Sequence, residues 1–309
     1  MERQKTRRPI ETVGLIGCGR MGCCMLESIV KGGYRVVVHD KFPAAMQRAA
    51  DMGAESADTP KELAGRSDVV LISLPGPVQL EEVLFGPCGL KEGLTDRHVV
   101  IDTSTVDPQT TRHNIRKLEE TGAAFLDCPI LGRPSAVGRW MLPAGGDPEA
   151  LEWVKPVLQT FAVDAIPVGG HGAGNALKLL NQMMFSCINA ISSEVMAICD
   201  HVGIDKNVFY NTVASSSAAT VSGLFCEVGR CIINDEFDTP SFTLDLLIKD
   251  TRLALQMAKE ANAPSIVAGT AQMFNELASA NGLGPLDTAA LYKVFERSFK
   301  ELRCKEELQ

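Results

Sequence analysis

Short apolar runs rich in β-branched residues alternate with helix-like segments over the first half of the chain. The runs lie at 13–16, 35–40, 69–74, 99–102, 124–130 and 165–168. Strands that alternate with helices along a chain pair in parallel, because a helical crossover returns the chain to the same edge of the sheet. Each run is apolar throughout, as in strands that helices cover on both faces. The pattern therefore predicts an α/β fold with a doubly wound, Rossmann-type parallel sheet.

After residue 168 no strand signal recurs. The segments with helical character are 175–202, 205–215, 222–234, 243–261, 264–280 and 286–302. The first of them is apolar on nearly every side, which is typical of a buried central helix. We therefore expect three parts: a disordered tail over 1–11, a Rossmann domain over 12–168, and an all-α domain over 169–309 with 175–202 as a long interdomain helix.

A glycine-rich segment, Gly17-Cys-Gly-Arg-Met-Gly22, directly follows the first strand run and opens a helix-like segment. Glycines at this spacing permit a tight turn and a close approach of the backbone to a pyrophosphate, while the helix N-terminus offers N–H groups to it. Asp40 ends the second run, where a carboxylate accepts hydrogen bonds from ribose hydroxyls. It also repels a 2′-phosphate, which favours NAD. Since Lys41 and Arg48 could neutralise such a phosphate, NADP stays open.

Lys178 lies within the apolar helix, with Leu177 and Leu179 beside it. A buried ammonium group must pair, extend to solvent or lose its proton. Asn181 and Gln182 follow three and four residues later, so they can share a helix face with the lysine. A lysine of lowered pKa can protonate a carbonyl oxygen that receives a hydride, and can accept the proton in the reverse reaction. Taken alone, the position fits a lysine that simply extends to solvent equally well.

Six motifs occur in a consistent order along the chain. They are Gly14-Leu-Ile-Gly-Cys-Gly-Arg-Met-Gly22, Asp40-Lys-Phe-Pro43, Leu74-Pro75, Asp102-Thr-Ser-Thr105, Gly172-x-Gly174-x-x-x-Lys178-x-x-Asn181, and Phe242 with Lys249-Asp250. With them the chain resembles the β-hydroxyacid dehydrogenase family over almost its whole length. This family includes 3-hydroxyisobutyrate dehydrogenase, tartronate semialdehyde reductase and sulfolactaldehyde reductase.

The resemblance implies roles for individual residues. Lys178 is expected to be the proton donor or acceptor and Asn181 to position the substrate. From their positions in the sequence, further substrate contacts are expected at Thr105, Gly132, Arg133 and Gln182. Cofactor contacts are expected from Gly17, Gly19, Arg20, Met21, Gly22, Asp40, Lys41, Leu74, Pro75, Thr103, Thr105, Phe242 and Lys249. The resemblance also implies a homodimer or homotetramer whose long helices interlock between subunits.

One loop departs from the family pattern. Where the family usually reads D-A-P-V-S-G-G, this chain has Asp127-Cys-Pro-Ile-Leu-Gly-Arg133, so the usual serine is Leu131 and the second glycine is Arg133. The planar fork of an arginine can hold two oxygens of a carboxylate or sulfonate. We therefore expect Arg133 to bind an anionic group on the substrate. A solvated Arg133, a pyrophosphate contact, and Arg139 in the same role are the alternatives.

Charge and composition exclude several other classes. The net charge of −8 argues against nucleic-acid binding, which needs a basic face. No stretch of roughly 18 consecutive apolar residues is present, so no membrane span is expected. Ten scattered cysteines and five histidines show no metal-ligand spacing, which indicates reduced thiols and no metal site. We expect a soluble cytoplasmic protein.

These patterns together predict an NAD-dependent oxidoreductase that interconverts a short-chain anionic hydroxy acid and its semialdehyde. An imine reductase-like enzyme and a non-catalytic, cofactor-bound binding module remain alternatives. A lysine at position 178 disfavours both, because it supplies the proton that hydroxy acid chemistry needs.

Overall fold

The computed structural model describes residues 8–298. The chain forms two compact units, Met1–Lys178 and Leu179–Gln309. Helix α7 begins in the first unit and continues into the second, and Lys178 is the last residue of the first.

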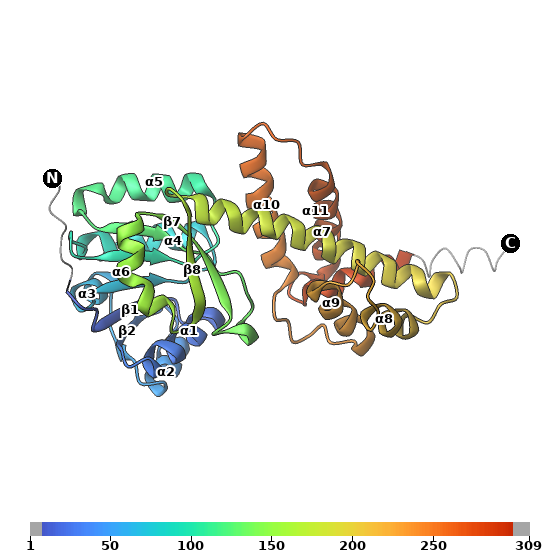
Figure 1. Cartoon of the computed structure of the whole chain (residues 1–309), viewed down its shortest axis with the longest axis horizontal. Helices are drawn as coiled ribbons and strands as arrows, with labels where there is room; N and C mark the ends of the chain where they lie inside the picture. The colour runs from blue at the N-terminus through green and yellow to red at the C-terminus, as the bar shows by residue number, and fades with distance from the viewer. Residues whose placement is uncertain (1–7, 299–309) are drawn as a thin grey trace. The chain divides into compact units, whose positions relative to one another are not determined.

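The first unit contains an eight-stranded sheet with the order β3-β2-β1-β4-β5-β6-β7-β8. The sheet and the helices beside it are drawn in blue to green in Figure 1. Its strands are β1 (Thr12–Ile16), β2 (Arg35–His39), β3 (Glu55–Ser56), β4 (Val69–Ile72), β5 (Val99–Asp102), β6 (Ala124–Asp127), β7 (Trp140–Gly146) and β8 (Ala162–Gly169). From β1 the chain first builds outward to β3, then returns to place β4 on the other side of β1. This reversal is the switch point at which doubly wound sheets bind ligands, outside the carboxyl ends of the strands. The predicted doubly wound α/β fold is confirmed.

Alternate residues of the central strands enter separate hydrophobic cores on the two faces of the sheet. Val13 and Leu15 of β1 belong to one core, and Ile16 belongs to the other. Leu71 and Ile72 of β4 divide in the same way. Burial on both faces explains why these strands read as continuous apolar runs rather than as alternating ones.

Strand β7 departs from the expected arrangement. It pairs antiparallel with β6, through Leu126 opposite Gly146 and Asp127 opposite Gly145, and parallel with β8. The apolar runs contain no sign of β7, because Pro143 and the two glycines at its end read as turn residues. Strand β3 is only two residues long and was not expected either.

Helices connect the strands of the first unit. They are α1 (Arg20–Lys31), α2 (Pro43–Asp51), α3 (Pro60–Gly65), α4 (Pro77–Phe85), α5 (Pro108–Leu118) and α6 (Pro148–Leu158), with short 3₁₀ turns η1 (Leu90–Glu92), η2 (Glu119–Thr121) and η3 (Pro134–Ala136). Helices α2 to α6 each begin with proline, whose missing N–H costs nothing at a position without an intrahelical partner. Thr59, Asp107 and Asp147 cap α3, α5 and α6 by accepting backbone N–H groups.

The second unit is helical. Its elements are the main part of α7 (Ala173–His201), α8 (Lys206–Ala214), α9 (Gly223–Asn234), α10 (Leu244–Glu260), α11 (Ile266–Ala278), the π turn η4 (Ser279–Leu283) and the 3₁₀ turn η5 (Thr288–Leu291). They correspond to the helical segments expected from the sequence. The last expected segment, 286–302, begins as η5 and continues as a helix over 292–298, and its remainder lies outside the described residues.

Helix α7 is 29 residues long and apolar enough to cross a membrane by length and composition alone. The core helix of a soluble protein passes the same test. Polar side chains of α7 are buried and paired in the second unit: Asn275 Nδ2 donates to Ser186 Oγ at 2.9 Å, and Asn189 Nδ2 donates to the Thr288 carbonyl at 3.0 Å. This pattern is that of a helix packed within protein.

The expected tail over 1–11 lies partly outside the described residues, which begin at Arg8. The Trp153 indole donates to the Arg8 carbonyl at 3.0 Å, and the Glu11 backbone N–H donates to Asp68 Oδ2 at 2.9 Å. Residues 8–11 are therefore held against α6 and the residue that precedes β4.

Candidate active site

The glycine loop joins β1 to α1 at the switch point of the sheet. Gly17 has a φ of +94°, and a Cβ atom there would overlap the Ser73 carbonyl oxygen. A Cβ at Gly22 would overlap the carbonyl oxygen of Gly17. A Cβ at Gly19, by contrast, would meet no atom within 4 Å. Two of the three glycines are thus required by the fold itself, and the third borders open space that a bound group can approach closely.

The N-terminus of α1 suits an anion. Its N-cap residue is Gly19, no side chain caps the helix, and the first turn carries no acidic residue. Helix N-termini without such partners stabilise negative charge through their N–H groups and the helix dipole. The open space beside Gly19 and this uncapped terminus together fit the pyrophosphate of a dinucleotide. Arg20 is exposed and Met21 half-buried in the same turn.

Asp40 braces the glycine loop. Its Oδ2 accepts the Cys18 backbone N–H at 2.8 Å, and its Oδ1 accepts the Phe42 backbone N–H at 2.9 Å. Each carboxylate oxygen has a second lone pair, so Asp40 can still accept a bond from a ribose hydroxyl. Burial, followed by the charge of Asp40, raises the pKa of Cys18 to about 12. Lys41 is exposed, with Nζ 5.3 Å from the centre of the Phe42 ring.

Two loops expected on the nicotinamide side follow β4 and β5, and a hydrogen bond joins them. The Leu74 backbone N–H donates to Ser104 Oγ at 2.9 Å. Thr103 is buried, and its hydroxyl donates to the Ile72 carbonyl at 2.8 Å. This side chain therefore links the end of β5 to the end of β4. Pro75 is exposed and Thr105 half-buried beside it in the linked loops. Ser104 was not singled out from the sequence, although it lies inside the quoted Asp102–Thr105 motif.

The loop between β6 and β7 contains the departure from the family pattern. Leu131 pairs with Met141 across the loop, Gly132 is exposed, and Arg133 is half-buried. Arg139, the expected competitor of Arg133, is exposed on the same loop. The arginine that replaces glycine is therefore the less exposed of the two.

The start of α7 is clamped to the sheet by Asp127. The two carboxylate oxygens of this buried residue accept the backbone N–H groups of Gly172 at 2.8 Å and of Asn175 at 3.0 Å. A Cβ at Gly174 would overlap the Asp127 carbonyl oxygen, so the helix and strand backbones touch directly. Burial raises the pKa of Asp127, although the same two N–H groups oppose that shift. Lys178 follows Asn175 by three residues and is half-buried, so the clamp fixes its position relative to β6.

In the second unit a chain of polar contacts links three expected site residues through one that the sequence interpretation gave no role. Asn181 is exposed, and its Nδ2 donates to Gln182 Oε1 at 3.3 Å. Gln182 is buried, and its Nε2 donates to Asp250 Oδ2 at 2.7 Å. The other oxygen of Asp250 lies 2.8 Å from Lys249 Nζ. Gln182 was expected to contact substrate, but its amide is turned inward to hold Asp250. Phe242 packs edge-to-face on Phe185, with centroids 5.6 Å apart.

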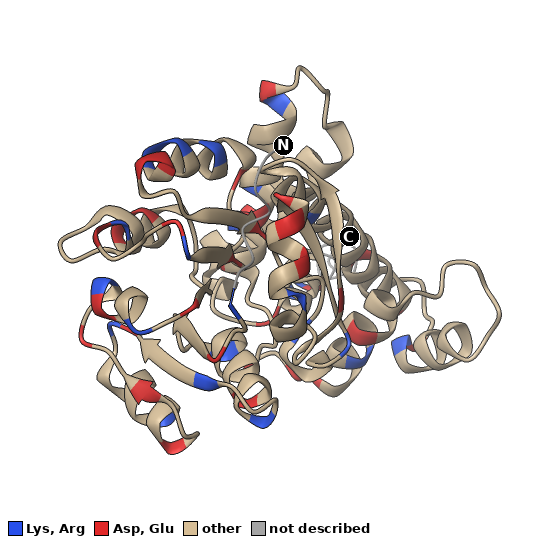
Figure 2. Ribbon diagram, turned by 60° about the vertical axis from the view of Figure 1, so that its left-hand side comes forward, with Lys and Arg blue, Asp and Glu red and all other residues tan. Residues whose placement is uncertain are grey.

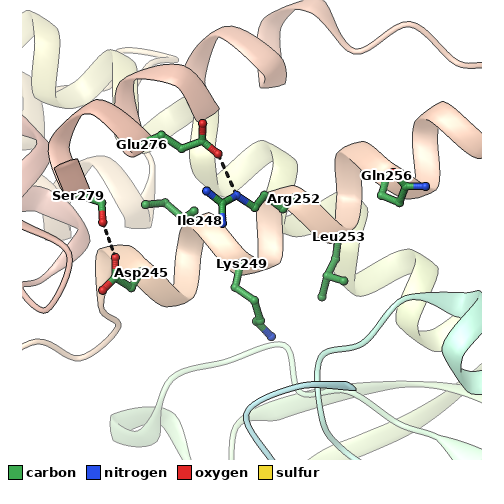
Figure 3. Close-up of a pocket in the computed structure, with 8 residues that line it drawn as sticks. All are labelled: Asp245, Ile248, Lys249, Arg252, Leu253, Gln256, Glu276 and Ser279. Atoms are coloured by element: carbon green, nitrogen blue, oxygen red, sulfur yellow. Dashed lines mark hydrogen bonds and ion pairs between the residues drawn. The ribbon is translucent and has the colours of Figure 1, made fainter. Parts of the chain in front are cut away.

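A hollow of about 640 Å³ lies along α10 and α11, and Lys249 is one of the residues that line it (Figure 3). Arg252 Nε pairs with Glu276 at 2.9 Å, and Ser279 donates to Asp245 at 2.7 Å. Lys249 extends from α10 away from Glu276 (Figure 3). The Lys249 side chain is thus directed away from the ion pair of Arg252 and Glu276, which joins α10 to α11.

Basic and acidic residues occur together on individual helices (Figure 2). Lys31 pairs with Glu27 within α1, and Lys117 of α5 pairs with Glu81 of α4. Among residues 8–298 no group of three or more histidine, cysteine or acidic side chains is placed to hold a metal ion.

Comparisons with known proteins agree with this architecture. Residues 12–170 match the NAD-binding domain of 6-phosphogluconate dehydrogenase, and residues 172–295 match the NAD-binding domain of NADP-dependent 3-hydroxyisobutyrate dehydrogenase. The chain is 31% identical to L-threonate dehydrogenase of Cupriavidus necator, over 92% of this chain and 95% of that protein. It is 30% identical to 3-sulfolactaldehyde reductase of Escherichia coli, over 90% of this chain and 94% of that protein.

A solved structure of 3-hydroxyisobutyrate dehydrogenase from Salmonella typhimurium superposes with a TM-score of 0.84. It is 27% identical, and the match covers 92% of this chain and 100% of that one. Both halves of the chain are thus matched in order by domains that bind a nicotinamide cofactor. The chain belongs to the β-hydroxyacid dehydrogenase family and is an NAD(P)-dependent oxidoreductase of that class.

Proposed function

We propose that this protein interconverts a short-chain anionic hydroxy acid and its semialdehyde with NAD, and that Lys178 donates and accepts the proton. The observation that carries the proposal is the placement of Lys178, half-buried on a helix whose first turn is clamped by Asp127. A proton donor must keep one position relative to the reacting oxygen, and a clamped helix provides that. No metal is needed, because the ammonium group itself stabilises the developing negative charge.

The chemistry divides between cofactor and protein. When bound, the nicotinamide supplies the hydride in reduction and accepts it in oxidation. In reduction, the substrate oxygen gains negative charge, and Lys178 passes a proton from Nζ to it. In oxidation, the neutral amine of Lys178 takes the hydroxyl proton. Asn181 orients the substrate oxygen from the next turn of α7.

Arg133 gives the site its preference for acidic substrates. Its guanidinium binds the carboxylate or sulfonate at the far end of the substrate through two parallel hydrogen bonds, which also fix the angle of the carbonyl. Support comes from the half-burial of Arg133 and from its place at the carboxyl edge of the sheet. Arg133→Ala should reduce kcat/KM for the acidic substrate by about 30- to 4,000-fold, the scale for removing one member of a buried charge pair.

NAD is the proposed cofactor. Asp40 directly follows β2, and its carboxylate is held by the backbone N–H groups of Cys18 and Phe42. A carboxylate at this position of a Rossmann domain supports NAD, because it would repel the 2′-phosphate of NADP. Nine described cysteines are free thiols, which suits a reducing compartment, and we place the protein in the cytoplasm.

A homodimer or homotetramer is the proposed assembly. Leu180, Met184, Ile191 and Ile198 recur along α7 at intervals of four and seven residues and are between 38% and 64% exposed in the single chain. Apolar side chains at this spacing form a stripe that suits a helix partner. Sedimentation of the wild type should give a dimer or tetramer, and Ile191→Asp should shift it toward monomer. A monomeric wild type at micromolar concentration contradicts the proposal.

The function is tested with a panel of hydroxy acids and semialdehydes that carry a carboxylate, a sulfonate or no charge. Turnover is followed by nicotinamide absorbance with NAD(H) and NADP(H), and a cyclic imine with NADPH tests the imine reductase alternative. We expect turnover of acidic substrates with NAD(H), and a large loss for them alone in Arg133→Ala. Turnover of the imine only contradicts the proposal, and NAD binding without any turnover would support the binding-module alternative.

A further inference from the structure

The loop that carries Arg133 is held at several points along its backbone. Leu131 and Met141 exchange backbone hydrogen bonds of 3.0 and 3.4 Å, which close the loop at the start of β7. The Gly138 backbone N–H donates to the Phe161 carbonyl at 2.8 Å. A loop fixed at both ends can present a side chain in one direction without ordering on binding.

Trp140 fixes the middle of this loop. It is fully buried, and its indole Nε1–H donates to the Arg133 carbonyl at 2.7 Å. The indole lies against Gly132 so closely that a Cβ there would overlap the ring. The indole also meets Phe161 edge-to-face, with centroids 6.2 Å apart. The indole therefore contacts two neighbouring residues of this loop: it packs on Gly132, and it donates a hydrogen bond to Arg133, the residue that replaces the second glycine of the family.

We propose that Trp140 is a positioning residue for substrate selection, acting through Arg133. By holding the Arg133 carbonyl, the indole N–H fixes the peptide plane from which the guanidinium extends. A buried N–H needs a partner, so the loop cannot move away without leaving the indole unsatisfied. The inference rests on the proposed role of Arg133, and it assigns the selectivity of the site to a pair, Arg133 and Trp140.

The simplest alternative is that Trp140 only fills the core. Trp140→Phe separates the two, because phenylalanine retains a buried ring against Phe161 and loses only the N–H donor. The Arg133 carbonyl is not left without a partner, since the Ala136 backbone N–H also donates to it at 2.9 Å. The variant should therefore fold, and its defect should be a less fixed orientation of the Arg133 side chain. Trp153→Phe is the matched control, because the Trp153 indole donates to a backbone carbonyl in the same unit, that of Arg8.

We expect Trp140→Phe to lower kcat/KM for an acidic substrate by about three- to tenfold, the usual scale for one hydrogen bond. For an uncharged analogue of that substrate, and for NAD affinity, the change should stay below about twofold on the same scale. Trp153→Phe should leave all three quantities unchanged. If Trp140→Phe does not fold, Trp140→Leu, which also keeps an apolar side chain in the core and lacks the N–H donor, should give the same selective loss.

A double-mutant cycle then tests the coupling. In an Arg133→Ala background, Trp140→Phe should cause no further loss with the acidic substrate, because the group it positions is gone. An equal loss in both backgrounds, or a loss shared by charged and uncharged substrates, overturns the positioning role and leaves the Arg133 proposal intact. If Arg133→Ala itself does not change the preference for acidic substrates, the Arg133 proposal fails, and the role of Trp140 fails with it.

Discussion

Gly19 and Gly22 should respond to alanine in opposite ways, although both belong to the same motif. A methyl group at Gly22 would overlap the carbonyl group of Gly17, which is part of the backbone and not a flexible side chain. Overpacking of this kind costs about 1–3 kcal/mol. We therefore expect Gly22→Ala to lower the melting temperature of the cofactor-free protein, and to weaken NAD binding only as a consequence.

Gly19→Ala should spare the fold and damage the cofactor site. Its φ of −73° suits alanine, and its Cβ would meet nothing within 4 Å. Replacing an N-cap glycine by alanine lowers the free energy of unfolding by about 1 kcal/mol at most. Part of this loss is offset, because alanine has less conformational freedom than glycine in the unfolded chain. The methyl group would instead project where the pyrophosphate must approach. If this overlap costs about 1–3 kcal/mol in the free energy of binding, NAD binds about five- to 150-fold more weakly.

The two variants are compared by thermal unfolding without cofactor and by calorimetric titration with NAD. The expected pattern is a stable Gly19→Ala protein with weak NAD binding and a destabilised Gly22→Ala protein. A Gly19→Ala protein that melts like the wild type and binds NAD with unchanged affinity would refute the assignment of this loop to the pyrophosphate.

Three further predictions concern charge and reactivity. Asp40→Ala should raise the ratio of NADP to NAD affinity, because it removes both a ribose acceptor and a repulsive charge; an unchanged ratio means that Asp40 acts on the loop alone. Burial lowers the pKa of His98, so the free energy of unfolding should fall as the pH drops below the ordinary value of 6.5, by at most about 1.4 kcal/mol per pH unit, and His98→Gln should lose this slope. Cys88 is exposed and Cys18 is buried with a pKa of about 12, so iodoacetamide followed by peptide mapping should label Cys88 first; equal labelling contradicts the packing of the glycine loop.

The sequence was most informative where the structure restricts a position to one kind of residue. Apolar runs revealed six of the eight strands, and the runs are clearest in β1, β4 and β5, where every residue is buried. The glycine spacing revealed the loop because a tight turn and a close approach of the backbone both require glycine. Strand β7 could not be found in this way, since Pro143 and its terminal glycines oppose the strand pattern while the neighbouring strands supply its hydrogen bonds.

The direction of a side chain is harder to read than its place on an element. Gln182 was grouped with Lys178 because residues four apart share a helix face, yet its amide is buried against Asp250. Asp127 lay in a quoted motif, but its clamp on α7 depends on strand β6 and on residues 45 and 48 positions later in the chain. Contacts over such separations leave no local pattern in the sequence.

Single-turnover hydride transfer in Lys178 variants tests the central claim most directly. Protein saturated with NADH is mixed with an acidic semialdehyde from the panel, and the loss of nicotinamide absorbance is followed. Lys178→Ala should bind NADH as the wild type does and react about 10²- to 10⁴-fold more slowly, the scale for a positioned general acid. Lys178→Arg should be similarly slow, because arginine retains the positive charge but does not release its proton. Transfer at the wild-type rate in Lys178→Ala would contradict the assignment, and recovery of the rate in Lys178→Arg would show that charge alone, and not proton donation, is required.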